Sequence, residues 1–192
     1  DQLPYVAVKE SVFPFDRFEN ADVFLRPEMR STGEVMGIDQ RFGAAVFKAF
    51  QSTNISVAHT GAVFVSVNDN DKNRMYPIAE GLYKLGWELV ATSGTAEYLS
   101  NRGIPVRTIL KVSEGRPNII DEIKNANIQL VIKTPMGQRS RKDEFTIGQA
   151  AIKNKVPFIT TLSAAEAILR GIKTHQRRPF DYKCLQEYHK MK

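Results

Sequence analysis

The stretch from Trp87 to Thr95, WELVATSGT, places an apolar segment directly in front of a turn and a helix start. Its first half is short and apolar, which is typical of a parallel strand buried on both faces. Its second half supplies three hydroxyl groups around Gly94, a residue that lets other backbone or a ligand approach closely. A strand that feeds a helix in this way is one unit of an alternating strand–helix fold.

The same alternation runs from Gly61 to the end of the chain. The segments predicted as strands are Ala62–Val67, Trp87–Ala91, Val106–Ile109, Leu130–Lys133 and Phe158–Thr161. The helices expected between them cover Met75–Leu85 (with Pro77 in the first turn), a segment opened by Pro117, Ile147–Asn154, and a segment started by the capping box Ser163–Glu166. The predicted fold is therefore α/β and Rossmann-like: a five-stranded parallel sheet with helices on both faces.

The first 60 residues follow a different pattern. Short extended pieces are expected at Val6–Val8 and Phe13–Phe15, and Asp39 is expected to cap an amphipathic helix that ends near Phe50. Residues 51–60 are polar without periodicity, which indicates a linker. The predicted division is an N-terminal part (1–50), a linker (51–60) and the α/β domain (61–192).

Composition excludes several classes of protein. The chain has 192 residues, 42% hydrophobic and 25% charged, as in ordinary globular proteins. No window reaches the roughly 18 unbroken apolar residues of a membrane span, and no signal peptide is visible, so we expect no membrane partner. Cys184 is the only cysteine, which favours a reducing compartment. We expect a cytoplasmic protein, or one in an organelle matrix after removal of a transit peptide.

The net charge of +6 allows three interpretations: a solvated basic face, a site for a small anion, or a nucleic-acid surface. The dense runs Arg139–Lys142 and His175–Arg178 flank expected helix ends and lack interleaved aromatic residues. Polynucleotide binding is therefore the least favoured, and no nucleic-acid partner is expected.

The three histidines, His59, His175 and His189, are far apart in the sequence. None has a cysteine or carboxylate at metal-ligand spacing, so we expect surface positions and no metal site.

The ends of the predicted strands carry the candidate site. Ligands of open parallel sheets bind at the carboxyl ends of the strands, where helices begin. Thr92–Thr95 at such a position indicates either a phosphate cradle on a helix N-terminus or plain capping by Thr92 or Ser93. Lys72 follows the first predicted strand, Lys111 follows the third, and Lys133 ends the fourth. Three lysines at one edge would repel one another unless an anion lies between them, which favours an anion pocket.

The segment Pro27–Gly37, PEMRSTGEVMG, resembles the end of the second ATP-grasp half of the carbamoyl-phosphate synthetase large subunit. From Gly61 on, the chain resembles the C-terminal allosteric domain of the same family, which is related to methylglyoxal synthase. The matching motifs are Ala91–Ala96 (ATSGTA), Lys111–Pro117 (KVSEGRP) and Thr160–Leu162 (TTL). The resemblance implies a C-terminal fragment of that subunit with a methylglyoxal-synthase-like fold.

The resemblance also implies a function. The parent enzyme makes carbamoyl phosphate from bicarbonate, glutamine-derived ammonia and two ATP, with Mg²⁺ or Mn²⁺, for pyrimidine and arginine biosynthesis. Its C-terminal domain binds UMP as an inhibitor and IMP as an activator in bacterial relatives. The expected partners are such a nucleotide, the rest of the large subunit and a glutaminase small subunit, in an oligomer. The fragment itself is expected to hold no cofactor and no catalytic residue.

Position by position, the resemblance assigns the phosphate contacts to Lys72, Thr92, Thr95 and Lys111, with Ser93 and Gly94 in the same turn. The ribose side falls on Lys133, Thr134 and Gly137, where Lys133 replaces an asparagine common in the family. Glu10 and Thr160 match residues that help to bind ornithine in enteric relatives, and Phe158 replaces a tyrosine there.

The rival hypothesis is a free-standing lyase, like methylglyoxal synthase, that acts on a triose phosphate. That chemistry needs an aspartate base and a histidine beside the phosphate. No histidine of this chain lies in a predicted strand-end loop, so the regulatory module is favoured.

Overall fold

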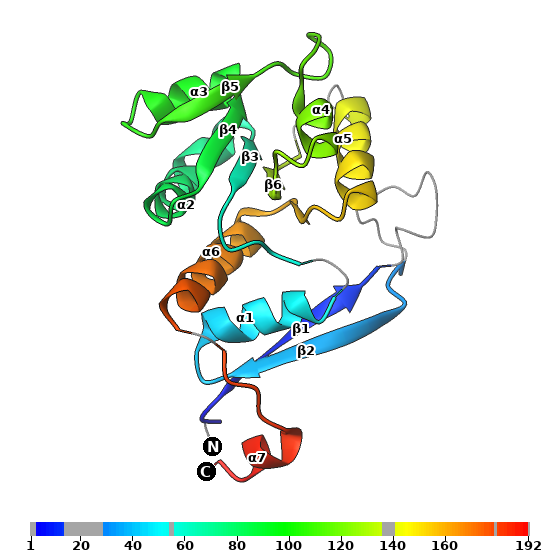
Figure 1. Cartoon of the computed structure of the whole chain (residues 1–192), viewed down its shortest axis with the longest axis vertical. Helices are drawn as coiled ribbons and strands as arrows, with labels where there is room; N and C mark the ends of the chain where they lie inside the picture. The colour runs from blue at the N-terminus through cyan, green and yellow to red at the C-terminus, as the bar shows by residue number, and fades with distance from the viewer. Residues whose placement is uncertain (1–2, 14–28, 54–55, 136–140, 179, 192) are drawn as a thin grey trace.

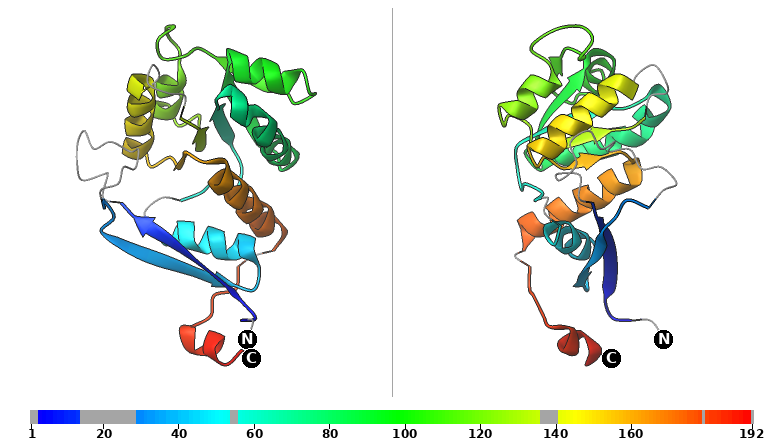
Figure 2. Two further views of the ribbon diagram at one scale, coloured as in Figure 1. Left: turned by 180° about the vertical axis from the view of Figure 1, so that it is seen from behind. Right: turned by 90° about the vertical axis from the view of Figure 1, so that its right-hand side faces the viewer.

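The computed structural model describes residues 3–13, 29–53, 56–135, 141–178 and 180–191. Figure 1 shows a five-stranded sheet with its helices in the upper half and a two-stranded hairpin with one helix below it. Helix α6 (Leu162–Arg177) lies between the two parts in all three views of Figures 1 and 2. None of the helices in the described ranges is long and apolar enough to cross a membrane.

The larger sheet confirms the predicted α/β fold. Its strands are all parallel and stand in the order β5-β4-β3-β6-β7. Their bounds are β3 Ala62–Ser66, β4 Glu88–Thr92, β5 Val106–Ile109, β6 Leu130–Lys133 and β7 Phe158–Ile159. The chain moves outward from β3 to β5 and then returns to place β6 beside β3. The direction of winding therefore reverses between β3 and β6.

Helices cover both faces of this sheet because alternate strand residues point to opposite sides. Val63 and Val65 belong to a core with α2 (Lys72–Lys84), α3 (Ser93–Ser100) and α6. Phe64, between them, belongs to a second core with α4 (Ile119–Lys124) and α5 (Arg141–Lys153). Two buried faces explain why the central strand β3 is almost wholly apolar, whereas the edge strand β5 carries the exposed Arg107 and Thr108.

The N-terminal part forms an antiparallel hairpin of β1 (Val6–Val12) and β2 (Gly33–Asp39), covered on one face by α1 (Phe42–Gln51). Gly37 permits the close approach of β2 and α1, since a Cβ built there would lie 2.1 Å from the Ala45 carbonyl oxygen. No strand was expected at Gly33–Asp39. Its pairing with β1 is a contact between distant segments and leaves no local periodicity.

The C-terminal segment returns to the hairpin. α7 (Leu185–His189) places the Tyr188 hydroxyl within 2.8 Å of the Ile38 carbonyl oxygen, to which it donates. The Tyr5 and Tyr188 rings meet edge to face at 5.5 Å. The division into 1–50, 51–60 and 61–192 stays a prediction, and this contact crosses it.

Two predicted helix starts were wrong in the N-terminal half of the chain. Asp39 ends β2, and Arg41 is the N-cap of α1; the Arg41 amide donates to Asp39 at 2.9 Å. Pro77 lies inside α2 because that helix begins earlier than expected, after a 3-10 turn, η2 (Asp69–Asp71), that Asn68 caps. Burial of the apolar stripe of α2 offsets the backbone hydrogen bond that proline removes.

Two more starts were wrong further along. Pro117 precedes α4, whose N-cap is Asn118; the Asn118 side chain accepts the Ile120 amide at 3.0 Å, and Asp121 accepts the Asn118 amide. Ser163 lies inside α6, because Thr161 caps that helix and accepts the Ala164 amide at 3.2 Å. In both cases the side chain of the residue directly before the helix satisfies one of the first free amides.

Candidate functional site

The candidate site lies at the carboxyl ends of β3, β4, β5 and β6, which we call the carboxyl edge. Thr92 at the end of β4 is in register with Ile109 of β5, and Ser66 of β3 is in register with Lys133 of β6. The loops that follow these strands therefore leave the sheet at one edge. This edge includes the reversal of winding, where open α/β sheets bind ligands.

The structure brings Lys72 to the first turn of α3. Ser93 and Gly94 are exposed there, and Thr95 is buried. A Cβ built on Gly94 would lie 3.7 Å from the Lys72 ammonium nitrogen. Thr92 is the N-cap residue by backbone geometry, but its side chain makes no capping hydrogen bond, and Ser93 is already inside the helix. The simple capping interpretation of Thr92 or Ser93 is therefore not observed.

The lysines of the exposed part of the edge each have a carboxylate partner. Lys72 pairs with Asp69 at 2.7 Å, and Lys111 pairs with Glu114 at 2.9 Å. The Lys111 amide also donates to Glu114 at 3.0 Å, and these contacts with Lys111 hold the pKa of the Glu114 carboxyl below its usual value. The repulsion that we expected among unpaired lysines is therefore absent, because the chain supplies its own counter-charges.

Lys133 lies beneath the surface. Its side chain is 4% exposed and forms an ion pair at 3.7 Å with Glu144 of α5, which is also 4% exposed. Burial lowers the pKa of the Lys133 ammonium group, and Glu144 opposes this shift. Thr134 is buried as well, and its hydroxyl accepts the Asn68 amide at 3.2 Å. Gly137 lies outside the described residues.

Asn68 is a residue of this edge that the sequence analysis missed. Its side-chain amide donates to Asp71 at 2.6 Å and to the Thr134 hydroxyl at 3.4 Å, and its carbonyl accepts the Asp71 amide at 3.1 Å. Asn68 thus ties the loop after β3 to the loop after β6. An Asn three residues before Asp71, directly after an apolar strand, was the available signal for such a cap.

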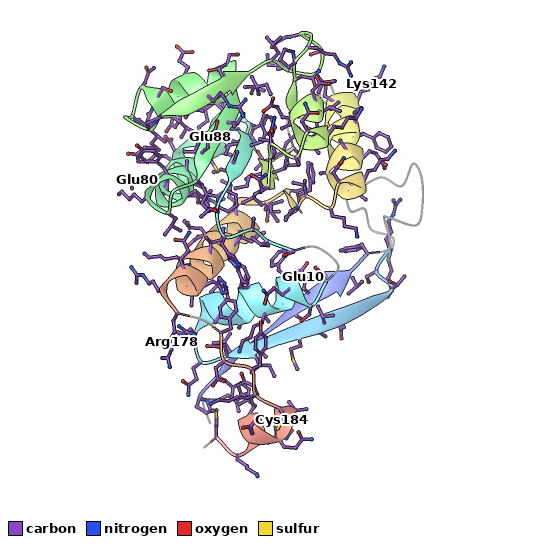
Figure 3. All side chains as sticks on the ribbon, in the orientation of Figure 1. Glu10, Glu80, Glu88, Lys142, Arg178 and Cys184 are labelled. Carbon is purple, nitrogen blue, oxygen red and sulfur yellow. The ribbon has the colours of Figure 1, made fainter. Side chains whose placement is uncertain are left out.

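The two residues matched to ornithine binding belong to different parts of the fold. Glu10 lies in β1 opposite Val35, and Figure 3 shows it in the hairpin half of the molecule. Burial raises the pKa of its carboxyl group. Thr160 follows β7, and no hydrogen bond or ion pair joins these two described residues. An ornithine site built from them would need further groups.

Of the three histidines, which we expected at the surface, His59 and His189 are exposed, whereas His175 is partly buried. The His59 and His175 rings stack at 4.0 Å, and the Phe47 and Phe180 rings lie within 5.0 and 4.4 Å of His175. Burial, with a smaller contribution from His59, lowers the pKa of His175. Within the described ranges, no group of three or more histidine, cysteine, aspartate or glutamate side chains could hold a metal ion.

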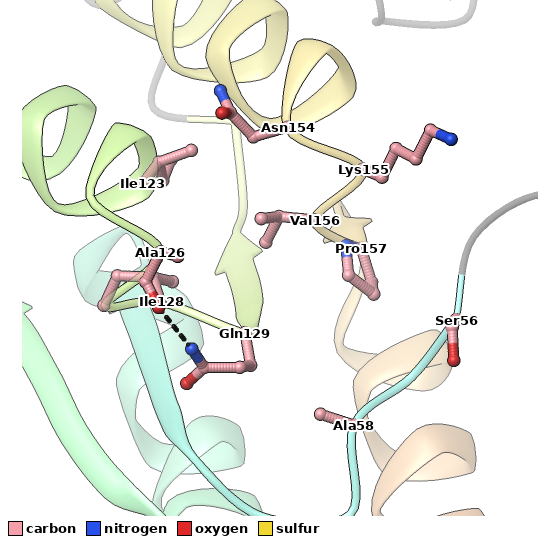
Figure 4. Close-up of a pocket in the computed structure, with 10 residues that line it drawn as sticks. All are labelled: Ser56, Ala58, Ile123, Ala126, Ile128, Gln129, Asn154, Lys155, Val156 and Pro157. Atoms are coloured by element: carbon pink, nitrogen blue, oxygen red, sulfur yellow. Dashed lines mark hydrogen bonds between the residues drawn. The ribbon is translucent and has the colours of Figure 1, made fainter.

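Two pockets of the described surface lie away from the carboxyl edge. One, of about 250 Å³, opens where the chain enters β3, β6 and β7 and is lined by residues such as Ala58, Gln129 and Pro157. Figure 4 shows Gln129 donating to the Ala126 carbonyl inside it, at 2.7 Å. The other lies between α2 and α6. None of the predicted site residues lines either pocket.

Comparison with known proteins shows which family the chain is similar to. The family model of the MGS-like domain matches residues 74–160. A carbamoyl phosphate synthase large chain from Synechocystis is 48% identical over 185 residues, which are 96% of this chain and 17% of that protein. A carbamoyl phosphate synthase large chain, C-terminal section, from Methanopyrus kandleri is 45% identical over 186 residues, 96% of this chain and 34% of that protein.

A solved structure described as "Crystal structure of ForH" aligns with 62% of this chain and 81% of its own chain, with 21% sequence identity. Its TM-score of 0.47 is too low to indicate a shared function. The chain spans 17% of the length of full-length relatives such as the Synechocystis protein. The identities, close to one half over nearly the whole chain, and the MGS-like model agree with the fold described above. This chain belongs to the carboxy-terminal, MGS-like section of the carbamoyl phosphate synthase large-chain family.

Proposed function

We propose that this chain is the regulatory, effector-binding module of a carbamoyl phosphate synthase, and that it binds UMP or a related nucleotide at the carboxyl edge. The observation that carries the proposal is the position of the Lys72 ammonium group beside Gly94, at the first turn of α3. A helix N-terminus offers free amides and a positive dipole end, and the adjacent lysine adds a full charge.

The phosphate would lie between this turn and Lys111. Gly94 lets a phosphate oxygen approach the backbone, and the exposed Ser93 offers a hydroxyl next to it. Lys111 lies just after the neighbouring strand β5, and about half of its side chain is exposed. Thr92 and Thr95 belong to the same turn, and Thr134, which follows β6, would mark the ribose side of the site.

The parent protein, on this proposal, makes carbamoyl phosphate from bicarbonate, glutamine-derived ammonia and two ATP with Mg²⁺. The rest of the large subunit and a glutaminase subunit would be its partners, in an oligomer that serves pyrimidine and arginine synthesis. The module itself would be non-catalytic. Ornithine would bind it weakly, because Glu10 and Thr160 supply only part of a site.

No observation favours the rival lyase. His59 precedes β3 and so lies at the opposite end of the sheet, while His175 and His189 belong to the ends of α6 and α7. Among the described residues, the carboxyl edge therefore has no histidine to assist a reaction on a triose phosphate.

Calorimetric titration of UMP into this chain tests the proposal. Lys111→Ala removes a charge-assisted hydrogen bond worth roughly 1.5–3 kcal/mol, so affinity should fall about ten- to a hundred-fold. Lys84→Ala is the matched control, since Lys84 is also exposed and paired with a carboxylate, Glu80, but lies at the far end of α2. If Lys111→Ala binds UMP as tightly as the parent chain, the nucleotide site lies elsewhere.

A further inference from the structure

Two carboxylates of the chain stand where an anionic ligand would have to bind. Asp69 lies 2.7 Å from the Lys72 ammonium nitrogen, and Glu114 lies 2.9 Å from that of Lys111. Each carboxylate lies three residues before or after its lysine: Asp69 begins η2, just ahead of Lys72 at the start of α2, and Glu114 shares the loop after β5 with Lys111. Both cations that the proposed site offers to a phosphate are therefore already neutralised.

We propose that Asp69 and Glu114 are internal counter-ions that occupy the anion positions of the carboxyl edge, and that a phosphate ligand must displace them to bind. This inference rests on the proposed function, because it describes how that same site is kept closed to weak anions. A ligand binds only if its contacts with both lysines and with the amides of α3 outweigh the two internal pairs.

The Lys72 pair has the asymmetry that such an exchange needs. The Asp69 side chain is 92% exposed, whereas that of Lys72 is 17% exposed. The Lys72 ammonium group also lies 5.8 Å from the centre of the Tyr98 ring, a distance at which a cation is attracted to the ring. The lysine is thus held beside Gly94, and the carboxylate can rotate into water without uncovering any buried group.

The Lys111 pair is held more firmly, because Glu114 makes two contacts. One oxygen pairs with the ammonium group and the other accepts the Lys111 amide at 3.0 Å. Both side chains are still 41% exposed or more. A phosphate that pairs with the Lys111 ammonium group would leave the hydrogen bond from the Lys111 amide to Glu114 in place. Glu114 can therefore lose its ion pair with Lys111 while the 111–114 turn stays folded.

The buried pair at the same edge behaves differently. Lys133 and Glu144 are each 4% exposed, and separating them would leave two charges without water. Of the three lysines at the described part of the carboxyl edge, only Lys72 and Lys111 can therefore exchange a carboxylate partner for a ligand.

Substitutions that remove the charge and keep the shape test this inference. We would titrate UMP, and separately inorganic phosphate, into the parent chain, Asp69→Asn, Glu114→Gln and the double variant. Exposed ion pairs are weak, so each single variant should bind about two- to five-fold more tightly, and the double variant about four- to twenty-five-fold. Glu80→Gln is the control: it removes the same charge from an exposed pair of α2, on the outer side of the helix (Figure 3), and should leave affinity unchanged.

The outcomes separate the inference from the proposed function. If the parent chain binds UMP and the Asp69 and Glu114 variants bind it equally or more weakly, the counter-ion inference is wrong and the nucleotide site stands. If neither the parent chain nor the double variant binds UMP or phosphate, the site itself is wrong, and the inference falls with it.

A second test uses the parent chain alone, so it does not depend on whether any variant folds. The contact with Lys111 lowers the pKa of Glu114, so the carboxyl resonance of Glu114, followed by ¹³C NMR, should titrate at higher pH in saturating UMP than in the free chain. An unchanged titration in the presence of bound UMP would show that Lys111 keeps Glu114 as its partner, and would overturn the inference.

Discussion

Two regions of this molecule use lysine–aspartate pairs in opposite ways. At the junction of β2, α1 and the C-terminal segment, Lys48 pairs with Asp39 at 2.9 Å, and both residues are buried. At the carboxyl edge, Lys72 pairs with Asp69 at 2.7 Å, and the aspartate is almost wholly exposed. The distances are nearly equal, so distance does not separate the two pairs. Burial does, because only the buried pair cannot exchange its partner for water or a ligand.

The surroundings of Lys48 show what burial requires. Its ammonium group also donates to the carbonyl oxygens of Ile38, at 3.1 Å, and Asp181. Burial raises the pKa of Asp39, but the Arg41 amide and Lys48 outweigh this effect and the pKa is lowered overall. The charges of Lys48 and Asp39 are thus satisfied by fixed protein groups, and the network joins the C-terminal segment to the hairpin.

The largest effect on stability is expected from Lys48→Met. It removes the buried cation of the Asp39 carboxylate and leaves only the more exposed Arg41 guanidinium, at 3.4 Å. Removing one partner of a buried pair typically costs about 3–5 kcal/mol. Urea denaturation of this chain measures it. Lys84→Met, which breaks the exposed pair with Glu80, should cost at most about 1 kcal/mol. Equal losses for the two variants would break the distinction between buried and exposed pairs.

Lys133→Asn should follow closely, with a loss of about 3 kcal/mol, because Glu144 would remain buried without its cation. Urea denaturation again provides the measurement. Adding Glu144→Gln removes the stranded charge and should restore most of the loss. If Lys133→Asn is as stable as the parent chain, the Lys133–Glu144 pair can be separated at little cost. Lys133 would then be available to bind the ligand, like Lys72 and Lys111.

Gly43→Ala should cost roughly 1–3 kcal/mol, the usual range for forcing an extra methyl group into a packed contact. Gly43 lies where α1 crosses α6, and a Cβ there would be 2.4 Å from the Arg170 carbonyl oxygen. Thermal denaturation measures the loss. Gly33→Ala is the control, since a Cβ at Gly33 meets nothing within 4 Å. A harmless Gly43→Ala would mean that α1 and α6 can separate readily.

The smallest expected effect is a pH dependence of stability that arises from His175 of α6. The pKa of His175 is lowered in the folded chain, first by burial and then by His59, so the unfolded chain binds a proton more readily. Stability should be complete above the ordinary histidine pKa of about 6.5 and should fall as the pH drops below it.

Melting temperatures measured between pH 7.5 and pH 5.5 would show this decline. His175→Phe, which keeps a ring beside Phe47 and Phe180, should flatten it, whereas His189→Gln in α7 should not. A slope that persists in His175→Phe would assign the pH dependence to another group.

Local patterning was enough to predict the alternating fold. The strands of the parallel sheet are short apolar runs, and their neighbours along the chain carry helical spacing, so both signals lie within a few residues of one another. The placement of Thr92–Thr95 at a strand end followed from the same rule, and the structure adds Lys72 beside Gly94.

The state of each charged or aromatic side chain depended on contacts between distant segments. Nothing near Lys133 in the sequence indicates that Glu144 buries it, and nothing near His59 indicates a stack with His175. The strand Gly33–Asp39 was missed for the same reason, since its partner is β1. Residue type and spacing decide where a chain forms strands and helices, but burial and the choice of ionic partner arise only when separate elements pack together. For this reason the ion pairs of Lys72 and Lys111, which reach the surface, could be told from the buried pair of Lys133 only in the folded chain.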